Sequence, residues 1–148
     1  METFFDTSVL VSASERTHPH YEPASAAVRR VTGGQEKGLI CAHSIAEVYA
    51  SLTKLPVQPR IQPDQAARIM QENILPYFMP VPLELGDYLA ALDRVSAGGW
   101  SGGKIYDALL LQCAARCKVK RIYTFNLGDF RRLAAPEVQR LIQTPEAA

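Results

Sequence analysis

The sequence lacks any hydrophobic run long enough to cross a membrane as a helix. It has only three cysteines, without the even number and regular spacing of a disulfide framework, so a reducing, cytoplasmic location is expected. Its opening residues have neither the basic segment nor the apolar stretch of a secretory signal peptide. These features favour a protein that is made and used inside the cell.

Net charge is almost absent too, at +1, so the chain as a whole does not attract nucleic acid electrostatically. A basic surface would have to arise from local segregation of charged side chains. Arginine outnumbers lysine by eleven to five. Because a guanidinium group binds phosphate oxygens in pairs, this bias favours a phosphate-bearing partner.

The length and apolar content are ordinary. With 148 residues and 47% hydrophobic side chains, the chain can bury one core without disulfides or metals as staples. It contains no internal repeat, low-complexity tract or compositional break. A single domain over residues 1–148 is expected.

Short apolar runs alternate with longer amphipathic segments, which is typical of β-α repeats around a parallel sheet. Strands are expected at 3–5, 38–41, 77–81, 121–125 and 140–143, the third at a sheet edge because it contains proline. Helices are expected at 7–14, 21–31, 44–52, 64–75, 85–95, 105–117 and 127–133. The predicted fold class is α/β, with a central, mainly parallel sheet of four to five strands.

Acidic residues fall where such a sheet binds ligands. Asp6 ends the first expected strand, and Asp129 follows the strand at 121–125. Glu47 and Asp107 lie in the first turns of their helices, and Asp107 stands out on a mostly apolar helix. Ligands of open α/β sheets bind at the carboxyl ends of the strands. A carboxylate buried there needs a partner, because an unpaired one costs several kcal/mol or shifts its pKa.

Each acid also has a structural explanation. Ser44 and Glu47 match a capping box, and Asp6 could cap the helix that follows it. Asp107 and Asp129 could sit in helix first turns for electrostatic reasons or as caps. All four acting together at equivalent ends favours one shared metal ion.

Four motifs, in order, resemble those of PIN-domain nucleases. They are Phe5-Asp6-Thr7-Ser8-Val9-Leu10, Ser44-Ile45-Ala46-Glu47-Val48-Tyr49, Gly102-Gly103-Lys104-Ile105-Tyr106-Asp107-Ala108-Leu109 and Thr124-Phe125-Asn126-Leu127-Gly128-Asp129-Phe130. Thr144-Pro145 also resembles the family's usual ending. The resemblance covers essentially the whole chain, and the small size is similar to that of VapC-type toxins of bacterial toxin–antitoxin pairs.

The resemblance implies a three-layer α/β/α fold and a Mg²⁺-dependent endoribonuclease in which Mn²⁺ substitutes. The residues that it assigns to the acidic site are Asp6, Glu47, Asp107 and Asp129, lined by Ser8, Thr124 and Asn126. Many relatives carry an aspartate in place of Asn126, whereas others place the acid three positions later, so Asp129 either supplies the fourth ligand or leaves it weakened. A homodimer and a small antitoxin protein that covers the site are implied as well.

This chemistry suits the residue types. Carboxylates are hard oxygen ligands for Mg²⁺ or Mn²⁺, and such an ion activates water and draws charge from phosphate oxygens. Without the ion, clustered carboxylates repel one another and their pKa values should rise. Neither cysteine nor histidine is required.

Substrate contacts are less well defined by the sequence. The basic side chains that could hold a phosphate backbone are Lys104, Arg121, Arg131 and Arg132. Trp100, in the glycine-rich segment 96–103, offers either a stacking platform for an unpaired base or a lid that packs on the core. Apolar side chains that could contact protein partners are Tyr49, Leu52, Leu55 and Tyr88.

Other interpretations remain open. A haloacid-dehalogenase-like phosphatase would also begin with a strand-terminal aspartate, but it needs a second acid where this chain has Ser8. A non-catalytic binding scaffold would suit the neutral charge and Asn126. His43, four residues before Glu47, is expected at a strand end rather than on a metal, and His18 and His20 are expected in a surface loop.

Overall fold

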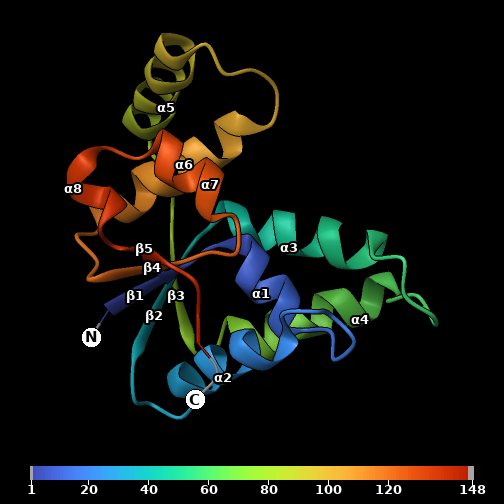
Figure 1. Ribbon diagram of the computed structural model, residues 1–148. Coiled ribbons are helices and arrows are strands. Elements are labelled where there is room, and N and C mark those ends of the chain that lie inside the picture. Colours follow the sequence, from blue (N-terminus) through green and yellow to red (C-terminus); the bar gives the residue numbers. More distant parts are fainter. Residues whose placement is uncertain (1, 147–148) are drawn as a thin grey trace.

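One parallel sheet forms the centre of the protein in a computed structural model that describes residues 2–146 (Figure 1). Its five strands are ordered β3-β2-β1-β4-β5, and all four neighbouring pairs are parallel. The strands are β1 (Glu2–Phe5), β2 (Lys37–Cys41), β3 (Phe78–Val81), β4 (Arg121–Tyr123) and β5 (Ile142–Gln143). The predicted parallel sheet is confirmed, and the proline-containing β3 lies at its edge as expected.

Helices cover both faces of the sheet. They are α1 (Thr7–Ala13), α2 (Tyr21–Thr32), α3 (His43–Lys54), α4 (Pro63–Arg68), α5 (Leu85–Gly98), α6 (Lys104–Arg116), α7 (Leu127–Leu133) and α8 (Pro136–Gln139), with a π-helical segment η1 (Ile69–Ile74) directly after α4. In Figure 1, α5 to α8 lie on one side of the strands and α1 to α4 on the other. This is the predicted three-layer α/β/α arrangement.

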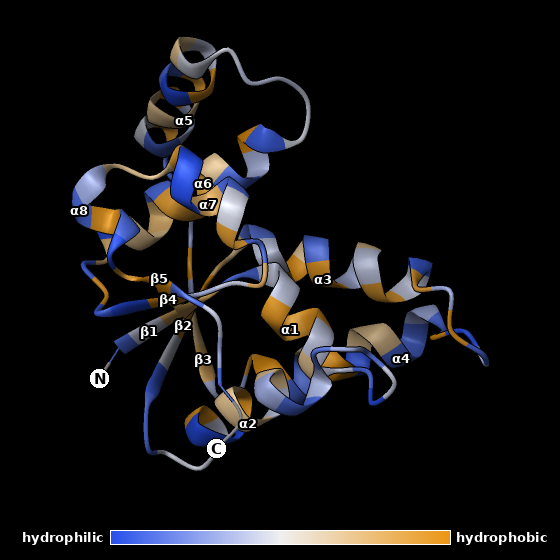
Figure 2. Ribbon diagram, viewed as in Figure 1, coloured by the Kyte–Doolittle hydropathy of each residue, from blue (hydrophilic) through white to orange (hydrophobic). Residues whose placement is uncertain are grey.

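Two hydrophobic cores hold the layers together. Neighbouring residues of β1 serve both, because side chains alternate across a strand: Phe4 packs with α5, α6 and α7, and Phe5 packs with α1, α2 and α3. Both phenylalanines are fully buried, which explains why two adjacent positions of β1 are both apolar instead of alternating with polar residues. Figure 2 shows hydrophobic residues along the strands and on the helix faces that cover them.

Close packing between β2 and β3 explains one glycine. A Cβ at Gly38 would lie 2.5 Å from the Phe78 ring, well inside van der Waals contact. The aromatic ring therefore occupies the space that any larger residue would need.

The structure differs from the sequence prediction in a few elements. The helix expected at 64–75 is split into α4 and η1, where Leu75 N–H bonds Met70 C=O over five residues. Helix α8 was not predicted, because its four residues are too few for a periodic pattern, although Pro136 takes the favoured first position. Within residues 2–146, no helix combines the length and apolarity needed to span a membrane.

Candidate active site

Asp6 is placed at the C-terminal edge of the sheet by the central strand β1. It follows the last residue of β1 and precedes α1, and its side chain is buried. Its Oδ2 accepts hydrogen bonds from the Ser8 and Thr124 hydroxyls, each at 2.7 Å. Two donors from different elements thus fix the orientation of this carboxylate. The α1 cap explanation is not supported, because Asp6 makes no side-chain cap hydrogen bond.

Glu47 reaches the same edge from α3. The Thr7 hydroxyl lies 3.1 Å from Glu47 Oε1 and 3.0 Å from Ser44 Oγ, so its single hydrogen is shared between two acceptors. The capping box that Ser44 and Glu47 could form is absent, because α3 begins at His43 and its cap position is Ala42, without a side-chain cap. Glu47 is therefore free to serve the site rather than its own helix.

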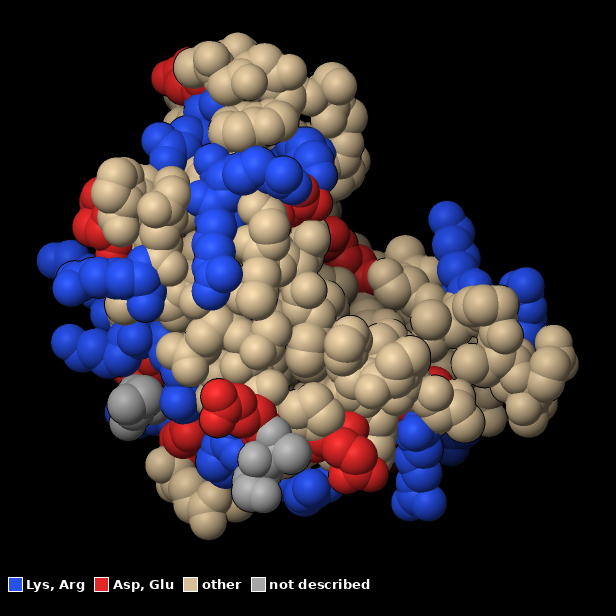
Figure 3. Space-filling view, in the orientation of Figure 1, with Lys and Arg blue, Asp and Glu red and all other residues tan. Residues whose placement is uncertain are grey.

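Asp107 comes from the first turn of α6. Its Oδ2 accepts a hydrogen bond of 3.3 Å from Asn126 Nδ2, which brings the loop after β4 against α6. Asp6, Glu47 and Asp107 line one open cavity of about 410 Å³, together with Ser8 and Asn126. Figure 3 shows acidic side chains recessed in the hollow between the α6–α7 side and α3. The structure thus brings three of the four predicted acids into one cavity, and their role as the acidic site stays a prediction.

Electrostatics distinguish this pocket from the rest of the protein. Burial, followed by the charges of Asp6 and Asp129, raises the pKa of Asp107 to about 7. Burial also raises the pKa of Glu47, with a further contribution from Asp6, and the pKa of Asp6 itself. Among the described residues that line the cavity, none is Lys or Arg. The cavity wall therefore supplies no lysine or arginine to neutralise these carboxylates, and Lys104, outside it, only partly offsets the charge at Asp107.

The donor set fits a hard divalent cation. All three acids present oxygen, the ligand atom that Mg²⁺ and Mn²⁺ prefer. A bound cation would favour their ionised forms, which burial disfavours at all three and neighbouring carboxylates disfavour at Glu47 and Asp107. Within residues 2–146, no three His, Cys, Asp or Glu side chains are close enough to surround a single metal position. Asp6, Glu47 and Asp107 share a pocket without forming such a cluster.

Asp129 lies beside this group rather than in the pocket. Its Oδ2 is 2.6 Å from Lys104 Nζ and its Oδ1 is 2.7 Å from Arg132 Nη2. These two partners lower the pKa of Asp129 to about 2. Both of its oxygens are thus occupied by cations of the protein, and its role as a fourth metal ligand stays a prediction.

The predicted substrate contacts have different surroundings. Ser8 and Asn126 line the pocket, whereas Thr124 is fully buried. Thr124 positions Asp6 through its hydroxyl, and its Oγ1 accepts a hydrogen bond of 2.9 Å from the Asn126 backbone N–H. Lys104 is engaged with Asp129. Trp100 packs over Gly98 and against the core with α5 and α6, so the structure supports its packing role rather than the stacking platform.

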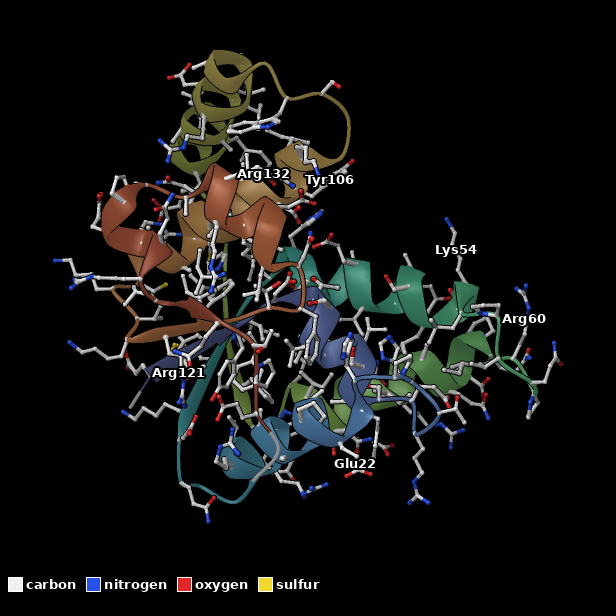
Figure 4. All side chains as sticks on the ribbon, viewed as in Figure 1. Glu22, Lys54, Arg60, Tyr106, Arg121 and Arg132 are labelled. Carbon is white, nitrogen blue, oxygen red and sulfur yellow. The ribbon has the colours of Figure 1, made fainter. Side chains whose placement is uncertain are left out.

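Arg121, which was expected among the side chains that hold a phosphate backbone, lies away from the pocket. Its Nη2 is 2.8 Å from Glu36 Oε1, and β4 pairs it with Thr3 near the start of β1, at the end of the strands away from the pocket. Figure 4 shows Arg121 on the opposite side of the view from Tyr106 and Arg132. The prediction that Arg121 flanks the active site is wrong, because Arg121 is the first residue of β4 and the pocket lies at the opposite, C-terminal ends of the parallel strands.

The sequence did not predict that two histidines line the pocket. His18 and His20, expected in a surface loop, line the cavity of the three acids. The His20 ring stacks on Phe125, with ring centroids 4.2 Å apart and planes at 9°. This contact joins two loops that are far apart in the sequence, so no local sequence pattern predicts it. His43 instead stacks on Tyr106 at the start of α3, near the strand end where it was expected.

The larger cavity in the protein lies elsewhere. It measures about 690 Å³ and is bounded by Ser14, Glu15 and Thr17, the loop 56–61 and the α4–η1 segment. None of the four predicted acids lines it. Size alone therefore does not single out the acidic cavity, and the three carboxylates with raised pKa values make it the candidate site.

Comparisons with known proteins agree with this geometry. A family model described as PIN domain matches residues 3–136. Ribonuclease VapC27 of Mycobacterium tuberculosis is 38% identical over 112 residues, covering 74% of each chain. Ribonuclease VapC40 of the same organism is 34% identical over 109 residues, covering 71% of this chain and 72% of that protein.

Solved structures share the fold at 15% sequence identity. VapC20 of Mycobacterium tuberculosis, described as a sarcin-ricin loop cleaving toxin, superposes with a TM-score of 0.66 over 86% of this chain and 92% of its own. VapBC2 of Rickettsia felis, bound to a promoter DNA fragment, also gives 0.66, over 99% of this chain and 100% of its own. Because the family model spans nearly the whole sequence and both ribonucleases align over more than two thirds of it, this chain belongs to the PIN domain family.

Proposed function

We propose that this protein is a VapC-type endoribonuclease that hydrolyses RNA phosphodiester bonds with a divalent cation, Mg²⁺ or its substitute Mn²⁺. The observation that carries the proposal is the shared pocket of Asp6, Glu47 and Asp107, whose pKa values are all raised. Three carboxylates that share a pocket without lysine or arginine, at the ligand-binding ends of the strands, lower stability and are suited to cation-assisted hydrolysis. Similarity to ribonucleases VapC27 and VapC40 supports the same activity.

The residues divide the work between them. When bound, the cation would activate water and draw charge from the phosphate. Asp6, held by Ser8 and Thr124, provides a fixed oxygen ligand. Asp107 provides a second, and it must release its proton to bind, because its pKa is about 7 without the cation. Glu47, whose raised pKa makes it a better proton acceptor, either completes the ligand set or accepts a proton from the attacking water.

A small antitoxin protein and a second copy of the chain are the proposed protein partners. The fold relatives include FitAcB of Neisseria gonorrhoeae and, each bound to a DNA fragment, VapBC2 of Rickettsia felis and FitAB. Helix α5 exposes an apolar stripe at helical spacing, formed by Leu85, Tyr88, Leu89 and Leu92. Of the predicted contact residues, Tyr49 and Tyr88 are exposed, but Leu52 is fully buried and belongs to the core. The free cysteines suit a reducing cytoplasm.

The phosphatase alternative lacks its general acid. At the position where it needs a second carboxylate, Ser8 donates a hydrogen bond to Asp6 Oδ2. This bond ties up an oxygen that the alternative would use as its nucleophile or leave open to phosphate. A covalent aspartyl-phosphate on Asp6 would be required to revive that interpretation.

Cleavage of defined RNAs tests the proposed function. We expect single-stranded RNA to be cleaved with Mg²⁺ or Mn²⁺ and to remain intact with chelator. Asp6→Asn, which keeps the size of the side chain and an acceptor oxygen, should remove cleavage while the protein stays folded by circular dichroism. If the purified protein binds the cation but cleaves none of a broad RNA panel, the non-catalytic scaffold would be the better description.

A further inference from the structure

The wall of the acidic pocket contains two imidazoles that the proposed chemistry does not use. His18 and His20 belong to the loop between α1 and α2, and they line the cavity that holds Asp6, Glu47 and Asp107. Among the described residues that line the cavity, these two histidines are the only side chains able to carry positive charge.

His18 is preset as a hydrogen-bond donor. Its Nδ1 accepts a hydrogen bond of 3.1 Å from the His20 backbone N–H. An imidazole that accepts at Nδ1 carries its proton on Nε2. Burial, assisted by the neighbouring His20, lowers the pKa of His18 and so favours this neutral form. His18 therefore offers an Nε2–H without first having to be protonated.

The His20 ring, stacked face to face on Phe125, offers one flat aromatic face beside that donor. The two rings are nearly parallel, and the His18 ring lies 5.8 Å from His20 at 39°. Phe125 is itself anchored, because its backbone N–H donates to Ser8 Oγ at 3.1 Å. The same serine holds Asp6, so the aromatic surface has a fixed position relative to the acids.

We propose that this histidine wall, formed by His18 and His20 with Phe125 behind it, binds the RNA strand next to the cleaved bond. His18 Nε2–H donates to a phosphate oxygen, and an unpaired base stacks on the free face of the His20 ring, which Phe125 supports from the other side. The inference rests on the proposed ribonuclease function and adds the residues that contact its substrate. It assigns binding, not proton transfer, to the histidines.

Steady-state kinetics on a single-stranded RNA that the parent protein cleaves, with Mg²⁺, test this assignment. We expect the double variant His18→Ala/His20→Ala to raise KM about 30-fold and to change kcat less than about threefold, because stacking and one phosphate contact are lost while the acids remain. His20→Phe keeps the flat ring and should leave KM within about threefold of the parent. His18→Ala alone should give an intermediate KM.

Two controls separate binding from structural effects. Thr17→Ala alters the same loop at an exposed side chain outside the acidic cavity, and it should leave KM unchanged. Calorimetric Mn²⁺ titrations of the double variant should give the parental dissociation constant. An unchanged KM in a folded double variant would overturn the histidine wall, and so would a parallel loss of Mn²⁺ affinity. If the parent cleaves no RNA, the proposed function itself fails, which is a different result.

Discussion

The two ends of the parallel strands, which form opposite edges of the sheet, hold carboxylates in opposite electrostatic states. At the edge where the strands begin, Glu36 Oε1 lies 2.8 Å from Arg121 and 3.2 Å from Arg30. Although burial acts to raise it, hydrogen bonding and charge from Arg121 hold the pKa of Glu36 below its usual value. At the edge where the strands end, Asp6 and Asp107 have no cationic partner in the pocket, and their pKa values are raised.

This contrast separates structural acids from functional ones. Asp87, paired with Arg116 at 2.9 Å, behaves like Glu36, and its pKa is lowered by that hydrogen bond in opposition to burial. A protein gains nothing in stability from leaving three carboxylates unpaired in one pocket, so the arrangement points to a ligand that supplies the missing charge. Asp129, paired with Lys104 and Arg132, has the electrostatics of a structural acid although it lies near the site.

The largest expected effect is on cleavage. Asp6→Asn and Asp107→Asn should each reduce the Mg²⁺-dependent cleavage rate about 100- to 1,000-fold, because each removes a charged oxygen ligand from the site. Rates on a defined RNA, corrected for the folded fraction, measure the effect. Glu36→Gln is the matched control at the other edge and should keep the parental rate per folded molecule. Near-normal cleavage by either pocket variant would contradict the comparison.

Stability should change in the opposite direction from activity. The unfolded Asp107 carboxyl ionises near pH 4, whereas the folded one ionises at about 7, so folding loses stability between these pH values. Asp107→Asn removes this penalty and should raise the free energy of unfolding of the metal-free protein by about 2 kcal/mol at pH 8, allowing for partial solvent screening. At pH 4 the gain should vanish. Urea unfolding in chelator gives both values, and a destabilised variant at pH 8 would refute the pKa assignment.

At the opposite edge the sign reverses. Glu36→Gln should lower the free energy of unfolding by about 1–2 kcal/mol at pH 7, because it leaves two partly buried arginines with a neutral partner. The folded pKa of Glu36 is lowered, so its contribution is present above the unfolded pKa and is lost as pH falls through the folded one. The variant and parent should therefore converge at acidic pH in thermal unfolding. An unchanged free energy of unfolding at pH 7 would show that the ion pairs of Glu36 with Arg30 and Arg121 do not stabilise the fold.

Asp129→Asn should have the smallest effect. We expect cleavage to fall about fivefold, because the variant loosens Lys104 and removes a negative charge beside Asp107. Calorimetric Mn²⁺ affinity should stay within about threefold of the parent. A loss of cleavage and of Mn²⁺ affinity as large as that in Asp107→Asn would instead make Asp129 a metal ligand.

Much of the fold could be predicted because burial repeats along the chain. Strand β1 was expected at 3–5 and is observed at Glu2–Phe5, and the helix expected at 127–133 is α7. The positions of Asp6, Glu47 and Asp107 followed from their motifs and from the rule that ligands lie at strand ends.

What could not be predicted depends on contacts between distant segments. His20 meets Phe125 only because the loops after α1 and β4 converge. The pairing of Lys104 with Asp129, and of Arg121 with Glu36, is likewise set by the packing of α6 on α7 and by the register of β1 and β4. Local patterns in the sequence identify charged residues but not the partners that neutralise them.

Divalent-cation binding tests the central claim most directly. Calorimetric Mn²⁺ titrations at pH 7, in two buffers of different ionisation enthalpy, report affinity and proton release together. The shared pocket of Asp6, Glu47 and Asp107 predicts binding with release of about half a proton from Asp107, whose carboxyl is about half protonated at pH 7, and a loss of affinity of more than about tenfold in Asp6→Asn/Asp107→Asn. Equal Mn²⁺ affinity in the parent and in this folded double variant would contradict it.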